Sequence, residues 1–83
     1  MGQTAQPEFK DHIFNLYRNV KFLRERKGLS IKQMAVIINI KEKHLILFEN
    51  YSDFGYFNDE HIKKACVFFN VTPNDLFRKR LWK

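Results

Sequence analysis

The sequence of 83 residues contains a single cysteine, Cys66, and no long run of apolar residues. One cysteine excludes an intrachain disulfide, and a reducing compartment is the simplest interpretation. The apolar runs are far too short to cross a bilayer, so no membrane partner is expected. The N-terminal MGQTAQPEF lacks a charged start followed by an apolar stretch, so we expect no signal peptide. These absences predict an intracellular protein.

The residues that most often support catalysis or metal binding are few and scattered. His12, His44 and His61 have no metal-ligand spacing with one another or with Cys66. No histidine close to a plausible nucleophile has a recognisable orienting partner. Cys66 is expected to be a small buried apolar residue. We therefore expect no enzyme, no metal site and no cofactor.

The sequence is rich in aromatic and basic residues. Aromatic residues make up 16% of the chain and nine of them are Phe, which indicates a folded domain rather than a disordered one. The formal net charge is +6. Residues 18–27 carry five positive charges and one negative, and residues 78–83 carry four positive charges. Residues 28–50, with three lysines and two glutamates, are nearly neutral. This balance is compatible with nucleic acid without requiring it.

A long first helix follows a short polar segment. Residues 1–7 are expected to be a disordered tail. From Glu8 onward apolar residues recur at spacings of three and four, which predicts one apolar helical stripe ending at Lys27-Gly28. The stripe consists of Phe9, Ile13, Leu16, Val20 and Leu23. Phe14, Tyr17 and Phe22 fall outside it or at its edge.

Two further helices are expected between Ser30 and Glu49. Ser30 with Gln33 has the spacing of a capping box, which predicts the start of the second helix. Its inner side is expected to carry Met34, Ala35 and Ile38. Asn39 readily adopts the left-handed backbone of a tight turn. The third helix is expected from about Lys41 to Glu49.

The last two helices have similar signals. Asn58 is expected to cap the fourth helix, and Asn70 to end it as Asn39 ends the second. Thr72 with Asp75 forms another capping box, with Pro73 at the first helical position. The inner stripe of the fourth helix is Ile62, Cys66 and Phe69. The chain is thus predicted to be all-α: a compact five-helix domain over residues 8–77, then a basic extension at 78–83.

The segment GLSIKQMAVIINIKEKHLILFEN (28–50) resembles the helix-turn-helix of the Cro and phage-repressor (XRE-like) family. In that resemblance Ala35 is the small residue at the helix crossing, Ile40 the apolar residue of the turn and Leu45 the buried aliphatic of the recognition helix. Phe48-Glu49 matches the closing apolar–acid pair. NDEHIKKACVFFNVTPNDLF (58–77) looks like the family's fourth helix and its ending. The resemblance spans roughly residues 16–77, with the motif at 31–50.

The resemblance implies a lambda-repressor-like domain that binds double-stranded DNA in the prokaryotic cytoplasm, encoded by the cell, a phage or a mobile element. The start of a projecting helix meets base edges in the major groove, and neighbouring residues hold phosphates. The candidate DNA-binding residues are Ser30, Lys32, Lys41, Glu42, Lys43, His44, Leu47 and Asn50. Other interpretations stay open: the lysines are also consistent with a solvated surface, and Glu42 with a favourable charge at the helix start.

The chain also departs from the family pattern. Ile31 stands where Gln is frequent, and Lys41 where Ser or Thr would cap the recognition helix. Ile46 and Leu47 replace polar residues, and Tyr51 replaces a glycine. Either this helix reads thymine methyl groups or it meets a protein; a rotated helix would instead place Ile46 and Leu47 partly in the core.

Two functions are therefore expected as alternatives. The first is a sequence-specific transcriptional regulator, a repressor acting as a homodimer on a two-fold symmetric site. Its candidate dimer surface consists of apolar residues left after the core is assigned: Phe14, Phe22, Val67, Phe68, Leu81 and Trp82. The second is a helix-turn-helix reused as a protein-interaction module, such as an inhibitor or antirepressor, with Ile46 and Leu47 as its contact.

Overall fold

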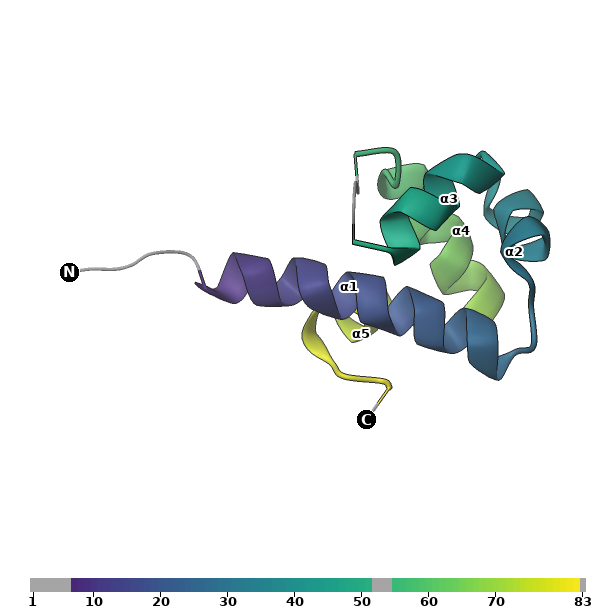
Figure 1. The fold of residues 1–83 in the computed structure, drawn as a ribbon. Coiled ribbons are helices and arrows are strands. Elements are labelled where there is room, and N and C mark those ends of the chain that lie inside the picture. The colour runs from purple at the N-terminus through teal and green to yellow at the C-terminus, as the bar shows by residue number, and fades with distance from the viewer. Residues whose placement is uncertain (1–6, 52–54, 83) are drawn as a thin grey trace.

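The computed structural model describes residues 7–51 and 55–82, and these form five α-helices (Figure 1). The long α1 runs the length of the molecule. The other helices pack along its C-terminal part, so the first turns of α1 extend beyond them (Figure 1). The helices are α1 Pro7–Arg26, α2 Ile31–Ile38, α3 Glu42–Glu49, α4 Asp59–Phe69 and α5 Pro73–Arg78. The predicted all-α class is confirmed, since no strand occurs within the two described ranges.

The predicted helix starts are present as hydrogen-bonded caps. The Ser30 hydroxyl accepts from the Gln33 N–H at 3.0 Å, and the Gln33 side chain accepts from the Ser30 N–H at 2.9 Å. Thr72 and Asp75 repeat the arrangement at 3.1 and 2.9 Å. Each pair satisfies two backbone donors that a helix start leaves free. The starts of α2 and α5 are therefore fixed by residues within four positions of each other.

The predicted helix ends are present too. Asn39 and Asn70 both adopt the left-handed conformation, with φ of 59° and 57°. After Asn39 the chain needs only Ile40 and Lys41 before α3 begins, and the Ile40 N–H donates to the Ala35 carbonyl at 2.9 Å. The short connection makes α2 and α3 direct neighbours. α1 ends before Gly28, which has a φ of 75°.

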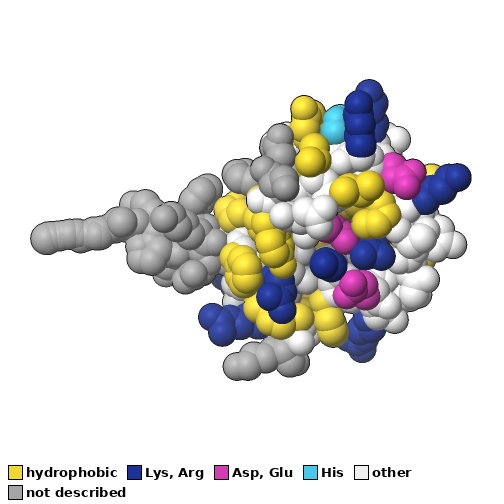
Figure 2. Space-filling view, in the orientation of Figure 1, with side chains coloured by type: hydrophobic (Ala, Val, Ile, Leu, Met, Phe, Trp, Pro, Cys, Tyr) yellow, Lys and Arg dark blue, Asp and Glu magenta, His cyan; other side chains and the backbone are white. Residues whose placement is uncertain are grey.

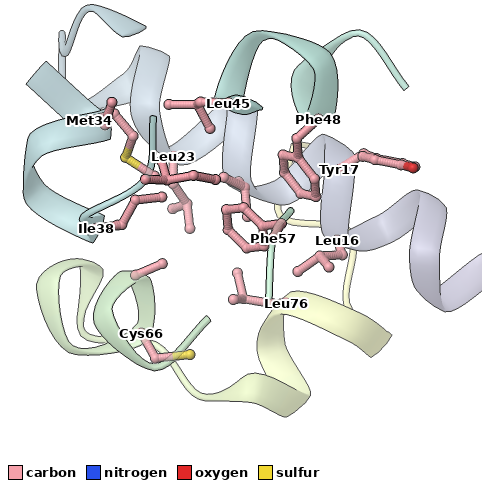
Figure 3. Close-up of a cluster of buried hydrophobic side chains, with 14 residues drawn as sticks. Leu16, Tyr17, Leu23, Met34, Ile38, Leu45, Phe48, Phe57, Cys66 and Leu76 are labelled. Atoms are coloured by element: carbon pink, nitrogen blue, oxygen red, sulfur yellow. The ribbon is translucent and has the colours of Figure 1, made fainter. Parts of the chain in front are cut away.

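The core lies between α1 and the four shorter helices (Figure 3). The predicted inner residues Met34, Ala35, Ile38, Ile40 and Leu45 are buried, as are Leu16, Val20 and Leu23 of the α1 stripe. Ile13, Ile62 and Phe69 pack against the core while partly exposed. The side chain of Phe9 lies outside the described residues, as does the predicted tail except for Pro7, where α1 begins.

The periodicity of α1 missed one core residue, and a second core aromatic comes from the loop before α4. Tyr17 was predicted to lie outside the apolar stripe or at its edge but is buried, with its ring centroid 4.9 Å from that of Phe48. Phe57 stacks on the ring of Phe48, with the two ring centroids 4.0 Å apart. A helix packed on two sides buries more than one stripe, because α3 covers an additional face of α1.

The C-terminal segment is held to α1 by a buried amide. Asn19 is fully buried, and its Nδ2 donates to the carbonyls of Leu76 and Lys79, both at 2.7 Å. Its Oδ1 accepts from the Leu81 N–H at 2.8 Å. One side chain therefore bonds the backbone at three positions, from the end of α5 to residue 81. The basic extension predicted for residues 78–83 follows a fixed path along α1 as far as Trp82.

Cys66 is buried, as expected from its place on the inner stripe of α4. Burial, with a smaller contribution from the charge of Asp75, raises the pKa of its thiol. Within residues 7–51 and 55–82, no three His, Cys, Asp or Glu side chains lie close enough to share a metal ion. No helix of this part of the chain is long and apolar enough to cross a membrane.

Candidate nucleic-acid interface

One face of α3 fastens the helix to the domain. Leu45 and Phe48 are fully buried, and Glu49 is only 4% exposed. The Glu49 carboxylate accepts from Nε and Nη2 of Arg24 at 2.8 and 2.9 Å. This hydrogen-bonded contact raises the pKa of Arg24. α3 is thus held at two buried apolar side chains and one charged pair, which fixes its orientation.

The opposite face of α3 is open to solvent. Lys41, Glu42, Lys43 and Asn50 are exposed. Ile46 and Leu47 are also exposed, at 41% and 36%, so neither belongs to the core. The structure therefore brings together, on one anchored helix, most of the side chains predicted to contact DNA. The mixture is unusual for an outer face because two aliphatic side chains lie among charged ones.

The start of α3 lacks the side-chain cap found at α2, α4 and α5. Lys41 occupies the N-cap position, and no side chain accepts there. The His44 N–H instead donates to the Lys41 carbonyl at 3.0 Å. Glu42, in the first turn, places a negative charge near the positive end of the helix dipole. Lys41, which stands where Ser or Thr was expected, thus leaves the start of α3 without a side-chain cap.

His44 has a contact that the sequence did not predict. Its ring stacks on that of Tyr56, with centroids 3.6 Å apart and planes 5° from parallel. Tyr56 comes from the loop before α4, so the contact ties that loop to α3. A residue predicted to read bases is therefore half-buried beside a tyrosine.

Ser30 and Lys32 lie at the start of α2, apart from the outer face of α3. Both are exposed. The Ser30 hydroxyl oxygen is used in capping, but its hydrogen remains able to donate to a phosphate. These two residues can support binding from a second helix, while any base contact would come from α3.

The six candidate dimer residues occupy different surroundings. Val67 and Phe68 are exposed on α4, at 82% and 36%. Leu81 packs against the core of its own chain, and Phe22 is partly buried there. Phe14 and Trp82 contact each other edge to face, with centroids 6.2 Å apart. Leu81 and Trp82, assigned to a dimer surface from the sequence, lie against α1 of their own chain.

A cluster of aromatic residues around Arg18 was not predicted, although Phe14 and Trp82 were each assigned to a dimer surface. The Arg18 guanidinium carbon lies 4.9 Å from the Trp82 ring centroid and 5.6 Å from that of Phe14. Tyr51, directly after α3, lies 5.7 Å from Phe14. The spacing of Phe14 and Arg18 indicates a shared helix face. Nothing local in the sequence places Tyr51 and Trp82 beside them.

Comparisons with protein-family models, with curated proteins and with solved structures found no match to this chain. The functional argument therefore depends on the residues and their geometry.

Proposed function

We propose that the protein is a sequence-specific DNA-binding transcriptional regulator, with α2 and α3 acting as a helix-turn-helix and α3 as the recognition helix. The observation that carries the proposal is the two-sided character of α3. Leu45, Phe48 and Glu49 fix the helix, while Glu42, Lys43 and Leu47 face solvent. A rigidly held helix with an open face suits the major groove.

Each exposed side chain has a defined chemistry toward a base edge. Lys43 can donate to guanine, Glu42 can accept from the cytosine amino group, and Leu47 can pack on a thymine methyl group. Lys32, Lys41 and Asn50 are exposed nearby in sequence and can contact phosphates. The aliphatic pair Ile46 and Leu47 favours thymine-rich sites, because the thymine methyl is the apolar feature of the groove.

The test is selection of a duplex from a randomised pool, followed by fluorescence anisotropy of the best binder at increasing salt. We expect a selected sequence whose affinity falls steeply as salt rises. Lys43→Ala should weaken binding by about tenfold and relax the preference at one base pair. Lys63→Ala, which removes an exposed charge from α4, is the matched control and should change affinity far less. Equal affinity and selectivity of Lys43→Ala and the parent would refute the proposal.

We further propose a homodimer on a two-fold symmetric site, repressing transcription by occupying it. Val67 and Phe68 of the predicted dimer surface are neighbours on α4 and are 82% and 36% exposed, whereas Phe14 and Trp82 contact each other. Val67→Asp should shift the protein to monomer in sedimentation equilibrium and weaken binding to a symmetric duplex more than to a half-site. A Val67→Asp variant with unchanged mass and affinity would exclude this surface.

The exposure of Ile46 and Leu47 also supports a second function, capture of a protein by the outer face of α3. Apolar side chains on an exposed helix face are typical of helix-mediated protein contacts. Leu47→Asp should then abolish partner capture while leaving the thermal unfolding midpoint unchanged. If the same partners were retained by Leu47→Asp, this second function would be excluded.

A further inference from the structure

A groove on the α1 side of the domain combines cations with exposed aromatic rings. It has a volume of about 460 Å³ and includes no residue of the proposed recognition surface. Its lining comes from α1, from the residue after α3 and from the C-terminal segment: Arg18, Lys21, Phe22, Glu25, Tyr51 and Trp82. Figure 2 shows hydrophobic side chains gathered over this part of α1, with Lys and Arg side chains among them.

The aromatic rings of the groove are accessible. Tyr51 of the lining and Phe14, which lies beside it, are each 44% exposed, although large aromatic residues usually bury more of their surface. Trp82 is half-buried and meets the edge of Phe14 at an interplanar angle of 89°. The planes of these rings differ in direction, so they present more than one surface on which a flat group can stack.

Trp82 is held in this position before any ligand binds. The Leu81 N–H donates to the buried Asn19 Oδ1 at 2.8 Å, and the Leu81 side chain packs on the core. The Arg18 guanidinium then lies 4.9 Å from the Trp82 ring centroid. Because the preceding residue is fixed, stacking on Trp82 would not require ordering of the chain.

Neither cation of the groove, Arg18 or Lys21, has an anionic partner among the residues that the structure describes. No salt bridge to Arg18 or Lys21 is found within the described parts of the chain, whereas the nearby Arg24 pairs with Glu49. The single acid of the lining, Glu25, lies 3.8 Å from Arg24. Cations beside open aromatic rings fit a ligand that carries both anionic groups and flat rings.

Charge and shape select among the possible occupants. A second copy of the chain would bring a net charge of +6 and another Arg18 and Lys21 to the same surface. A DNA duplex keeps its bases stacked inside, where Tyr51 and Trp82 cannot reach their faces. A single strand offers both accessible bases and closely spaced phosphates. Both cations of the lining, Arg18 and Lys21, belong to the basic segment 18–27.

We propose that this groove binds single-stranded nucleic acid, with bases stacked on Tyr51 and Trp82 and the backbone phosphates held by Arg18 and Lys21. The site is separate from the outer face of α3 and does not require that face to read duplex DNA. Affinity is therefore expected to depend on stacking and charge with little dependence on base sequence.

Trp82 is the only tryptophan, so its fluorescence reports directly on the groove. The probe is an oligothymidylate of about ten nucleotides, a length within the range that one small binding domain covers. We expect saturable quenching of Trp82 that weakens as salt rises. Dextran sulfate, a polyanion without bases, should bind without comparable quenching. Equal quenching by both polymers would show that charge alone is recognised and would overturn the proposal.

Variants separate stacking from charge. Tyr51→Asn keeps a residue that tolerates the left-handed backbone at this position but removes the ring, and should weaken oligothymidylate binding by about fivefold or more. Lys21→Gln should lower the affinity and reduce its salt dependence, while Lys63→Gln on α4 serves as the charge-matched control. Circular dichroism melts confirm that each variant is folded. If Lys21→Gln and Lys63→Gln behaved alike, or if a poly-glutamate peptide competed as well as the oligonucleotide, the groove would not be a nucleic-acid site.

A failure of single-strand binding can be distinguished from a failure of the proposed duplex binding. Lys43→Ala lies on α3 and should leave Trp82 quenching by oligothymidylate unchanged. Tyr51→Asn should leave affinity for the selected duplex within about twofold, since it removes no phosphate contact. Loss of single-strand binding in Lys43→Ala would mean that one surface serves both ligands and would overturn the separate site.

Discussion

Arg24 of α1 and Glu49 of α3 form a two-point ion pair, with Nε–Oε2 and Nη2–Oε1 distances of 2.8 and 2.9 Å. The third guanidinium nitrogen donates to the Leu29 carbonyl at 2.7 Å. One arginine thereby connects α1, the segment before α2 and the end of α3. Because Glu49 is on the helix whose outer face is proposed to read DNA, the position of that face depends on this contact.

Replacing Glu49 should therefore destabilise the fold strongly. Glu49→Gln leaves the largely buried Arg24 without its counter-charge, and we expect a loss of about 3 kcal/mol in the free energy of unfolding. Urea denaturation monitored by circular dichroism measures this free energy. Glu25→Gln is the matched control, because Glu25 is exposed and its 3.8 Å contact with Arg24 should contribute little. Similar unfolding midpoints for the two variants would contradict a structural role for the Arg24–Glu49 pair.

Replacing Asn19 should release the C-terminal segment. Asn19→Leu leaves the carbonyls of Leu76 and Lys79 and the N–H of Leu81 without the amide, at an expected loss of about 3 kcal/mol. Trp82 emission should shift to longer wavelength as the ring leaves α1. Asn15→Leu, which loses one bond to the Phe77 carbonyl, should be milder and leave that emission unchanged. An Asn19→Leu protein with parental Trp82 emission would show that other contacts hold the segment.

Tyr51 combines an unfavourable backbone with favourable ring contacts. Its φ is 62°, a conformation that strains a residue with a side chain, while its ring lies 5.0 Å from Tyr17. Tyr51→Ala removes the ring and keeps the strain; Tyr51→Gly removes both. We expect the glycine variant to be more stable than the alanine variant by about 1 kcal/mol. Differential scanning calorimetry measures the difference, and an alanine variant at least as stable would show that the backbone is not strained there.

Asp75 should make α5 sensitive to acid. The hydrogen bond from Lys79, followed by that from the Thr72 backbone, lowers the pKa of the Asp75 carboxyl from its ordinary 3.8. A lowered folded-state pKa means that the contribution to stability is complete above 3.8 and is lost as pH falls through the folded-state value.

The comparison is between the parent and Asp75→Asn in urea titrations from about pH 5 to about pH 2. The parent should have the higher free energy of unfolding at the upper end of this pH range. Its advantage over Asp75→Asn should shrink as the pH falls. A difference that stayed constant over the range, or grew toward acid, would contradict a lowered pKa for Asp75.

The helices were predictable because their signals are local. The capping pairs Ser30–Gln33 and Thr72–Asp75 and the turn residues Asn39 and Asn70 all act within a few positions of the helix end that they fix. Their hydrogen bonds form wherever the local backbone takes the right shape, so residue type and spacing were sufficient. The exposure of the predicted DNA-contacting residues of α3 follows in part from the same periodicity.

The remaining features needed contacts between distant parts of the chain. Tyr17 looked peripheral on the stripe of α1 and became core because Phe48 packs on it. Tyr56 gave no sign that it stacks on His44. Periodicity identifies one buried face of a helix but not how many neighbours that helix has.

The amino-acid sequence by itself determined the five helices, their boundaries and the placement of most core residues, because each depends on hydrogen bonds and periodicity within a few turns. Tertiary structure alone decided that Arg24 meets Glu49 and that Asn19 holds a segment 62 residues further along the chain. It also formed the groove between Tyr51 and Trp82. Buried polar groups must find partners wherever the packed chain brings them, and no local pattern specifies those partners.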